Sequence, residues 1–343
     1  MIKKQDKIRK RKKRVAMGRK RRLVVKKIAG KKRTYKFKKK RPAETAADAP
    51  VIAEPPQPVP VAAAAPEPRA HADRFEEGYK IGVYDGGEKL LSDMLPAFTI
   101  LPELTVRDVI AAGFEQVRHR LYPLLDPFTV FREMQQALNM RKPLSLVRLG
   151  DGELLTLAHD KVVSADQALR EGPFLKYAGV DIPDPEAGDL LAQSIRQATI
   201  IGIPVSRSPN FQQLLFPVLH HYQIGYSDLR MTISTMNYLL YQLGYLTMLM
   251  EGRRVLLVGN AAPALSGVLA RRCVQVAGVV APVNGMKDIQ RVMAEVAQYD
   301  FDMALVAAGI PAVVISQRIA SELGKVALDF GHLANKIATG ESI

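Results

Sequence analysis

The stretch LSLVRLGDGE, residues 144–153, indicates the fold of the C-terminal part of the chain. Its apolar first half is typical of a buried strand, and the glycines and carboxylates that follow are typical of a turn into a helix. The same pattern recurs along the chain, with further predicted strands at 199–205, 254–260, 273–282, 301–309 and 325–331. Apolar strands separated by helices predict an α/β domain over residues 130–343, with a mostly parallel sheet and flanking helices.

Small and polar residues follow most of these predicted strands. In a parallel sheet the turns after the strands meet at one edge, and ligands bind at that edge. We therefore predict a ligand site assembled from the ends of several strands. Its predicted members are Arg148, Gly150, Asp151, Gly152, Glu153, Gly259, Asn260, Asn284, Asp329 and His332.

Asp151 and Glu153 are two carboxylates separated by one glycine. If the segment is extended, both point to the same side and can hold one Mg²⁺ or Mn²⁺ ion. Gly152 would let a diphosphate approach the backbone, and Arg148 would donate hydrogen bonds to its phosphates. The alternative is a tight turn in which Asp151 caps the helix that follows. On the residues alone, the cap is the simpler interpretation.

A family resemblance favours the metal site. The runs LVRLGDGELL, GRRVLLVGN and FDMALVAAGIPAVVISQRIASELGKVALDFGH resemble the GT-D-type glycosyltransferases, and the resemblance covers residues 130–335. It implies a Rossmann-like domain with a D-x-E motif that binds a divalent metal and a nucleotide sugar, commonly a UDP-sugar. It carries that role onto Asp151 and Glu153. The expected activity is transfer of a sugar to an acceptor hydroxyl on a protein or a surface glycan.

Such a transfer with inversion needs a general base near the acceptor hydroxyl. Asp329 and His332 directly follow a predicted strand and are the first candidates. Asp184 and His159 are weaker candidates. A histidine at a strand end can also serve only to hydrogen-bond the edge of the sheet.

Two other functions remain open. The domain could be a catalytically silent binding module that a basic tail tethers to an anionic assembly. It could instead be another Rossmann-like transferase, for example one that uses S-adenosylmethionine, as the stretch VLLVGNAAP suggests. The incomplete glycine-rich loop after that strand disfavours the second alternative.

The N-terminal third of the chain has a different composition. Residues 1–41 contain 23 Lys and Arg and one acidic residue, Asp6, which makes their net charge +22. Because the whole chain carries +15, the remainder carries −7. We predict a disordered basic tail over residues 1–41 and an extended Pro/Ala-rich linker over residues 42–70. The tail is expected to bind an anionic polymer, an anionic surface or nucleic acid.

Residues 71–129 are predicted to form a helical connector. Gly78, Gly82 and Gly86 recur every four residues, which places them in one stripe of a helix. The stripe indicates either close helix–helix approach in a homo-oligomer or a weakly helical linker, and the two interpretations stay open.

Several classes of site and location are disfavoured. A single cysteine, Cys273, excludes a disulfide framework, and its apolar surroundings predict a core side chain. His220 and His221, at the end of a predicted helix, are interpreted as structural. The longest apolar run, residues 238–250, is too short for a membrane helix, and no apolar stretch typical of a secretory signal follows the N-terminal charges. We expect a soluble, cytoplasmic protein.

Overall fold

The computed structural model describes residues 68–341, so the predicted basic tail and nearly all of the predicted linker lie outside the described residues. The chain divides into two units, Met1–Met94 and Leu95–Ile343. The described part of the first unit contains the helix α2 (Pro68–Val83), one π-helical turn (Tyr84–Glu88) and α3 (Lys89–Met94). In this unit the glycine stripe of Gly78, Gly82 and Gly86 is helical, and no atom lies within 4 Å of a Cβ added at these glycines.

The second unit is built on one seven-stranded sheet in which every pair of neighbouring strands is parallel. Its strand order is β3-β2-β1-β7-β6-β4-β5, which places β1 in the interior of the sheet. The strands are β1 (Leu144–Arg148), β2 (Ile200–Ile203), β3 (Met231–Ile233), β4 (Arg254–Gly259), β5 (Gln275–Val280), β6 (Met303–Ala307) and β7 (Val326–Asp329).

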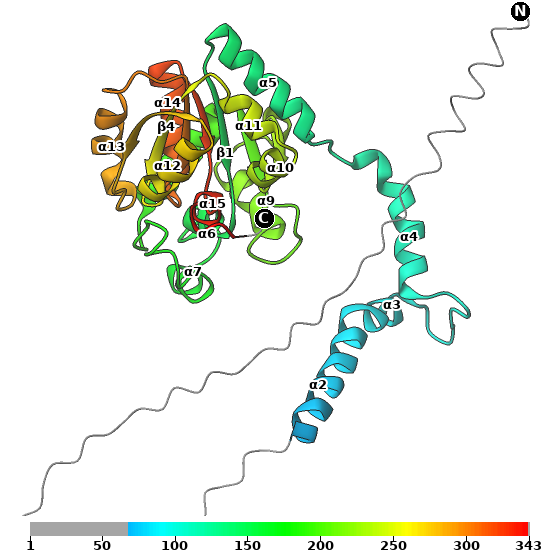
Figure 1. Cartoon of the computed structure of the whole chain (residues 1–343). Helices are drawn as coiled ribbons and strands as arrows, with labels where there is room; N and C mark the ends of the chain where they lie inside the picture. Colours follow the sequence, from blue (N-terminus) through cyan, green and yellow to red (C-terminus); the bar gives the residue numbers. More distant parts are fainter. Residues whose placement is uncertain (1–67, 342–343) are drawn as a thin grey trace, which may run out of the picture. The chain divides into compact units, whose positions relative to one another are not determined.

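Helices cover both faces of this sheet, as Figure 1 shows. Along β4, Val255 and Leu257 pack in one apolar core, while Leu256 and Val258 pack in the other, as the two-residue period of a strand requires. The helices of the first face are α6 (Asp151–Ala158), α7 (Ala165–Glu171), α8 (Pro185–Gln197), α9 (Gln212–His221), α13 (Ile289–Val296) and α14 (Pro311–Leu323). Those of the second face are α5 (Pro127–Met140), α10 (Met236–Gln242), α11 (Tyr245–Met250), α12 (Ala262–Arg271) and α15 (Leu333–Thr339).

The predicted α/β fold is confirmed, with differences in detail. Strand β3 was not predicted, because three residues are too few to show a pattern in the sequence. The apolar run 238–250 forms most of two short, partly buried helices, α10 and α11, separated at Gly244. Within residues 68–341 no helix combines the length and the apolar character needed to cross a membrane.

The prediction that Cys273 is a core residue was wrong. Cys273 is exposed, with a φ of 61°, in the tight turn between α12 and β5. Strand β5 begins only at Gln275, so the apolar run that starts at Cys273 includes the turn as well as the strand.

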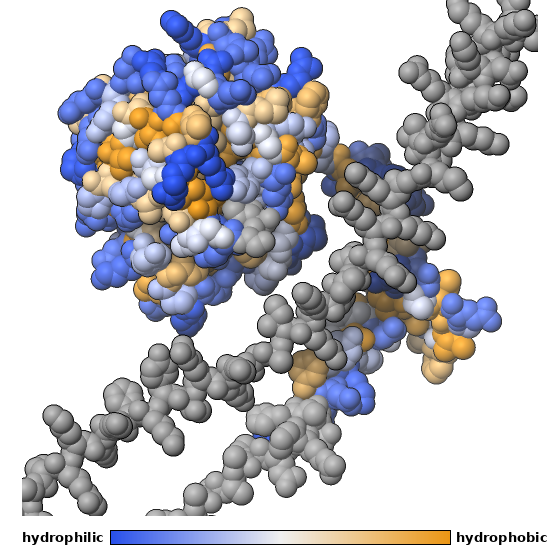
Figure 2. All heavy atoms as spheres, viewed as in Figure 1, coloured by the Kyte–Doolittle hydropathy of each residue, from blue (hydrophilic) through white to orange (hydrophobic). Residues whose placement is uncertain are grey.

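The connector before the domain is helical only in part. A helix α4 (Val106–Val117) begins at Thr105, whose hydroxyl and backbone N–H form a capping box with Asp108. Residues between α3 and α4 are not helical and expose apolar side chains, among them Phe98 and Ile100. Figure 2 shows hydrophobic surface, in orange, on this part of the chain.

Candidate functional site

The carboxyl ends of β1 and β7 lie side by side in the middle of the sheet. After β1 the chain continues into α6, whose Leu154 and Leu155 pack in the core of the first face. After β7 it continues into α15, whose Leu333 packs in the core of the second face. Neighbouring strands whose chains leave to opposite faces form a topological switch point, the usual position of a ligand site in such sheets.

Arg148, the last residue of β1, makes an ion pair with Asp329, the last residue of β7. Its Nη2 lies 3.0 Å from Asp329 Oδ1, and its Nε donates to the Asp329 backbone carbonyl at 3.0 Å. The backbone N–H of Arg148 donates to Asp329 Oδ2 at 3.2 Å, so both carboxylate oxygens are engaged. The guanidinium also donates from Nη1 to the Ser234 carbonyl at 3.1 Å, beyond the end of β3. Arg148 therefore ties together the carboxyl ends of three strands.

Two glycines make this arrangement possible. A Cβ at Gly202, on β2, would crowd the Arg148 side chain as it crosses towards Ser234. Gly331 has a φ of 51°, and a Cβ there would overlap with the guanidinium of Arg148. Asn237 completes the cluster, because its buried side chain donates to the Phe330 carbonyl at 2.8 Å and accepts from Arg148 Nη1 at 3.4 Å.

Asp151 and Glu153 lie in the first turn of α6, so the expectation of an extended segment was wrong. Gly150 is the residue before the helix, and its N–H donates to Glu153 Oε2 at 2.7 Å. Because glycine has no side chain, this bond is only one half of a capping box. Asp151 Oδ1 accepts from the N–H of Gly152 at 3.0 Å. Both carboxylates thus accept from backbone N–H groups at the start of the helix, and Asp151 is the first helical residue rather than the cap.

Burial raises the pKa of Glu153 to about 7, and the negative charge of Asp329 contributes in the same direction. Burial also raises the pKa of Asp329, against the opposing effect of Arg148. Only Asp329 forms an ion pair with Arg148, and Glu153, close to the charge of Asp329, holds its proton up to near-neutral pH.

The carboxylates at the start of α6 could hold a hard divalent cation only together with ligands from a bound substrate. Within residues 68–341, no three His, Cys, Asp or Glu side chains are grouped to hold a metal by themselves. Asp151 and Glu153 each engage one oxygen with the backbone and keep the other without a hydrogen-bond partner in the described part of the chain. Mg²⁺ is commonly held by one or two carboxylates together with substrate phosphates. Asp151 and Glu153 could supply the carboxylates of such a site.

Gly152 is packed rather than open. A Cβ there would lie 3.2 Å from a ring carbon of Phe174 and 3.4 Å from Ile310. The loop that carries Phe174 continues over the neighbouring strand ends, where the Ala178 carbonyl accepts from Ile310 N–H at 3.0 Å and the Gly179 carbonyl accepts from Met286 N–H at 2.9 Å. This loop therefore occupies backbone donors at the start of α14 and beyond β5.

The predicted binding residues at the ends of β4 and β5 are engaged with neighbouring parts of the protein. Gly259 has a φ of 124°, and a Cβ there would overlap with the Ala307 carbonyl of β6. Asn260 Oδ1 accepts from Val283 N–H at 2.8 Å, and its Nδ2 donates to the Val283 carbonyl at 3.1 Å. The backbone N–H of Asn284 donates to Asp288 at 3.1 Å.

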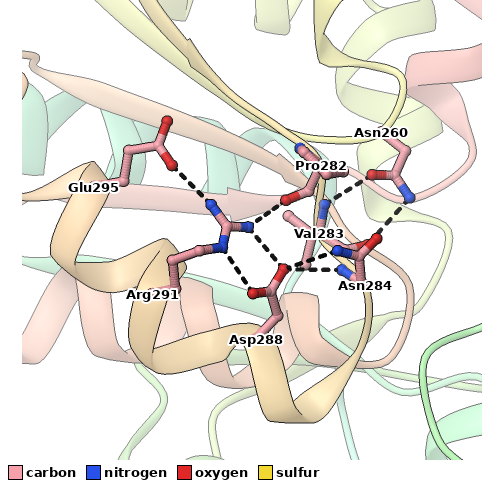
Figure 3. A network of polar contacts seen from close by, with 7 residues as sticks. All are labelled: Asn260, Pro282, Val283, Asn284, Asp288, Arg291 and Glu295. Atoms are coloured by element: carbon pink, nitrogen blue, oxygen red, sulfur yellow. Dashed lines mark hydrogen bonds and ion pairs between the residues drawn. The ribbon is translucent and has the colours of Figure 1, made fainter.

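Figure 3 shows this network, in which Arg291 lies between Asp288 and Glu295. Arg291 donates to both oxygens of Asp288 at 2.7 Å and to the Pro282 carbonyl, so the β5–α13 loop is held at several points. Asn260 and Asn284 thus have structural partners here, and their contact with a nucleotide sugar stays a prediction.

Replacing Asn260 with alanine is expected to lower the free energy of unfolding by about 1–2 kcal/mol, because the backbone N–H and carbonyl of Val283 lose their partners. Urea unfolding measures the change, and Asn335→Ala, at an exposed asparagine of α15, is the matched control. Equal stability of the two variants would show that the Asn260 side chain does not hold the strand ends together.

The candidate general bases differ in their exposure and in their hydrogen bonds. His332 is exposed at the start of α15, immediately after Gly331. Asp329 is only 3% exposed and has both oxygens engaged, so it is placed to position Arg148. His159 is buried; its Nε2 accepts from Asp184 N–H at 3.0 Å, which leaves Nδ1 to donate to the Thr156 carbonyl at 2.6 Å.

These contacts give His159 a structural role, and the Asp184 carboxylate likewise caps α8 through Ala187 N–H. His220 and His221 end α9, as the sequence indicates. Three parts of the site were missed from the sequence: Ser234, Asn237 and the loop with Phe174. Asn237 follows the short strand β3, which carries no clear strand pattern, so its position at the same edge had no signal.

No curated protein matches the chain. A solved structure, described as a highly conserved domain of unknown function with a distinct glycosyltransferase fold, is 17% identical over 62% of this chain and 81% of that chain. Its TM-score is 0.39, too low to support conclusions about this chain. A family model described as a GT-D fold-like domain matches residues 125–337, which is more than half of the chain. The chain therefore belongs to the family of GT-D fold-like domains.

Proposed function

We propose that this protein is a metal-dependent glycosyltransferase that moves a sugar from a nucleotide sugar, with a UDP-sugar as donor, to a hydroxyl group of a protein or surface glycan. Membership of the GT-D fold-like family supports a glycosyltransferase-type function. The observation that carries the proposal is the cluster of Glu153, Arg148 and Asp329 at the switch point between β1 and β7. Asp151 stands beside it in the first turn of α6.

The electrostatics of the cluster support a cation at this place. Glu153 has a pKa of about 7 because desolvation and the nearby charge of Asp329 both disfavour its ionised form. A divalent cation beside Glu153 and Asp151 would replace the proton that Glu153 otherwise holds and would offset the repulsion between the ionised Glu153 and Asp329. When bound, Mg²⁺ or Mn²⁺ would neutralise charge on the leaving nucleoside diphosphate.

Arg148 of the cluster and His332, at the same edge of the sheet, are assigned different roles. Arg148 has most of its N–H groups engaged by Asp329, Ser234 and Asn237, so we assign it to positioning the strand ends. His332 is exposed at the same edge of the sheet and is free of such contacts in the described part of the chain. We assign to His332 the removal of the proton from the acceptor hydroxyl.

Replacing Asp151 with alanine is expected to reduce turnover about 100-fold, because the leaving diphosphate would lose charge stabilisation. The measurement is release of nucleoside diphosphate from a panel of UDP-sugars and other nucleotide sugars with Mn²⁺ or Mg²⁺. The wild type should lose activity on addition of EDTA and regain it with excess metal.

Asp166→Ala is the matched control, because Asp166 is an exposed carboxylate in the first turn of another helix, α7. It should keep wild-type turnover. Turnover of Asp151→Ala equal to that of the wild type, or full activity in EDTA, would contradict the metal role. Absence of turnover with every donor would contradict the proposed activity itself.

Two partners outside the site remain proposals. The tail over residues 1–41, with its net charge of +22, is proposed to bind an anionic polymer, an anionic surface or nucleic acid in a salt-sensitive way. The stripe of Gly78, Gly82 and Gly86 is proposed to support self-association, since no atom of the described chain fills the space beside it.

A further inference from the structure

A cleft with a volume of about 380 Å³ opens on the first face of the sheet, between α8, α14 and the α13 region. It lies among the helices rather than at the cluster of Arg148 and Glu153. Its size is at the lower end of the range for ligand pockets, enough for a short segment of a longer chain.

The walls of the cleft carry amides and hydroxyls. Four glutamines and two serines contribute, while apolar side chains such as Ile289 and Val314 line it as well. The polar residues are Gln193, Ser194, Gln197, Gln290, Gln317 and Ser321. Side chains of this kind both donate and accept hydrogen bonds, and they carry no charge.

Two of these polar residues are almost completely buried and keep hydrogen-bonding capacity. Ser194 and Gln317 are each 3% exposed. Gln317 Nε2 donates to Gln197 Oε1 and to Ser321 Oγ, both at 3.0 Å. Within residues 68–341, neither Gln317 Oε1 nor Ser194 Oγ has a hydrogen-bond partner, although buried polar groups are normally paired. In that range Ser316 Oγ is the only fully buried side-chain atom without a hydrogen-bond partner. Gln317 Oε1 and Ser194 Oγ are therefore not fully buried, and both residues line the cleft.

The charges at the cleft are nearly balanced. Arg318 forms a two-point ion pair with Glu322, with distances of 2.6 and 3.1 Å. Lys287 is the remaining charged residue of the lining, at the end near Met286. An anionic nucleotide would find little compensation here, whereas an uncharged ligand with many hydroxyls would match the amides and the apolar side chains.

The cleft is connected to the edge that carries the proposed site. Met286 lines the cleft, and its N–H donates to the Gly179 carbonyl in the loop whose Phe174 covers Gly152. One loop thus contacts both the cleft wall and the start of α6.

We propose that this cleft binds a neutral carbohydrate segment and serves as a subsite for the acceptor glycan. The proposal rests on the proposed glycosyltransferase function. Gln317 and Ser194 would exchange hydrogen bonds with sugar hydroxyls, and Ile289 and Val314 would contact the apolar faces of the sugar rings.

The test is calorimetric titration of the full chain with a panel of neutral oligosaccharides, namely maltohexaose, cellohexaose and chitohexaose. We expect at least one to bind, and Gln317→Leu to weaken that binding at least 10-fold. Because Gln317 also links α14 to α8, Gln193→Ala is the second variant. It alters an exposed cleft residue and should weaken binding several-fold without unfolding. Gln213→Ala, at an exposed glutamine of α9, is the matched control and should bind as the wild type does.

Two further measurements separate this inference from the proposed function. Asp151→Ala should keep oligosaccharide binding, and Gln317→Leu should keep binding of UDP-sugar with Mn²⁺. The subsite is overturned if no oligosaccharide of the panel binds, or if both cleft variants bind as the wild type does. It is also overturned if a second copy of the chain covers the cleft, seen as a dimer that Gln193→Ala dissociates.

Discussion

Arg148→Met is expected to lower the free energy of unfolding by about 3–5 kcal/mol, the cost of leaving a buried charge without its partner. Asp329 is only 3% exposed and relies on Arg148 for its ion pair at 3.0 Å. The loss also removes the hydrogen bonds to Ser234 and Asn237, which join the end of β1 to the segment after β3. Urea or thermal unfolding of the wild type and the variant measures the effect.

A second substitution tests whether the loss of stability comes from the unpaired charge of Asp329. In Arg148→Met/Asp329→Asn the buried charge is absent, so part of the lost stability should return, and a double-mutant cycle gives the coupling energy. Arg170→Met, at an exposed arginine of α7, controls for the loss of an arginine and should change stability by less than about 0.5 kcal/mol. Additive effects of the two site substitutions would refute a direct coupling between Arg148 and Asp329.

Glu153 is expected to make the metal-free protein less stable as the pH rises from about 5 to 8. Its pKa is 4.5 in the absence of perturbation and about 7 in the fold. Between these values the folded state holds a proton that the unfolded state releases, so stability falls with increasing pH. The contribution is complete below pH 4.5 and lost above pH 7, and it amounts to about 3 kcal/mol.

The measurement is urea unfolding at several pH values in the presence of EDTA, for the wild type and Glu153→Gln. Glutamine can still accept from Gly150 N–H but cannot ionise, so the variant should gain about 3 kcal/mol relative to the wild type between pH 5 and 8. Glu186→Gln, at an exposed carboxylate in the first turn of α8, controls for the substitution itself. A stability difference between wild type and Glu153→Gln that does not vary with pH would refute the raised pKa.

The sequence was sufficient to predict the parallel sheet, because strand and helix periodicity are local properties of the chain. The stretches around β1, β4 and β6 are continuous apolar runs, and each is followed by a helix in the structure. Parallel strands all end at one edge of the sheet, so the sequence also predicted Arg148, Asp151, Glu153 and Asp329 at that edge. Strand β3 was not predicted because three residues are too few to show a period, and Cys273 was misplaced because a turn shares the apolar composition of the strand.

Which of those edge residues interact was decided only by the tertiary structure. Arg148 and Asp329 meet because β1 and β7, far apart in the sequence, are neighbours in the sheet. The raised pKa of Glu153 depends on its burial and on the charge of Asp329, and neither can be read from the local sequence GDGE. The fold class thus follows from short-range patterns in the sequence, whereas the charge balance of the site follows from long-range packing.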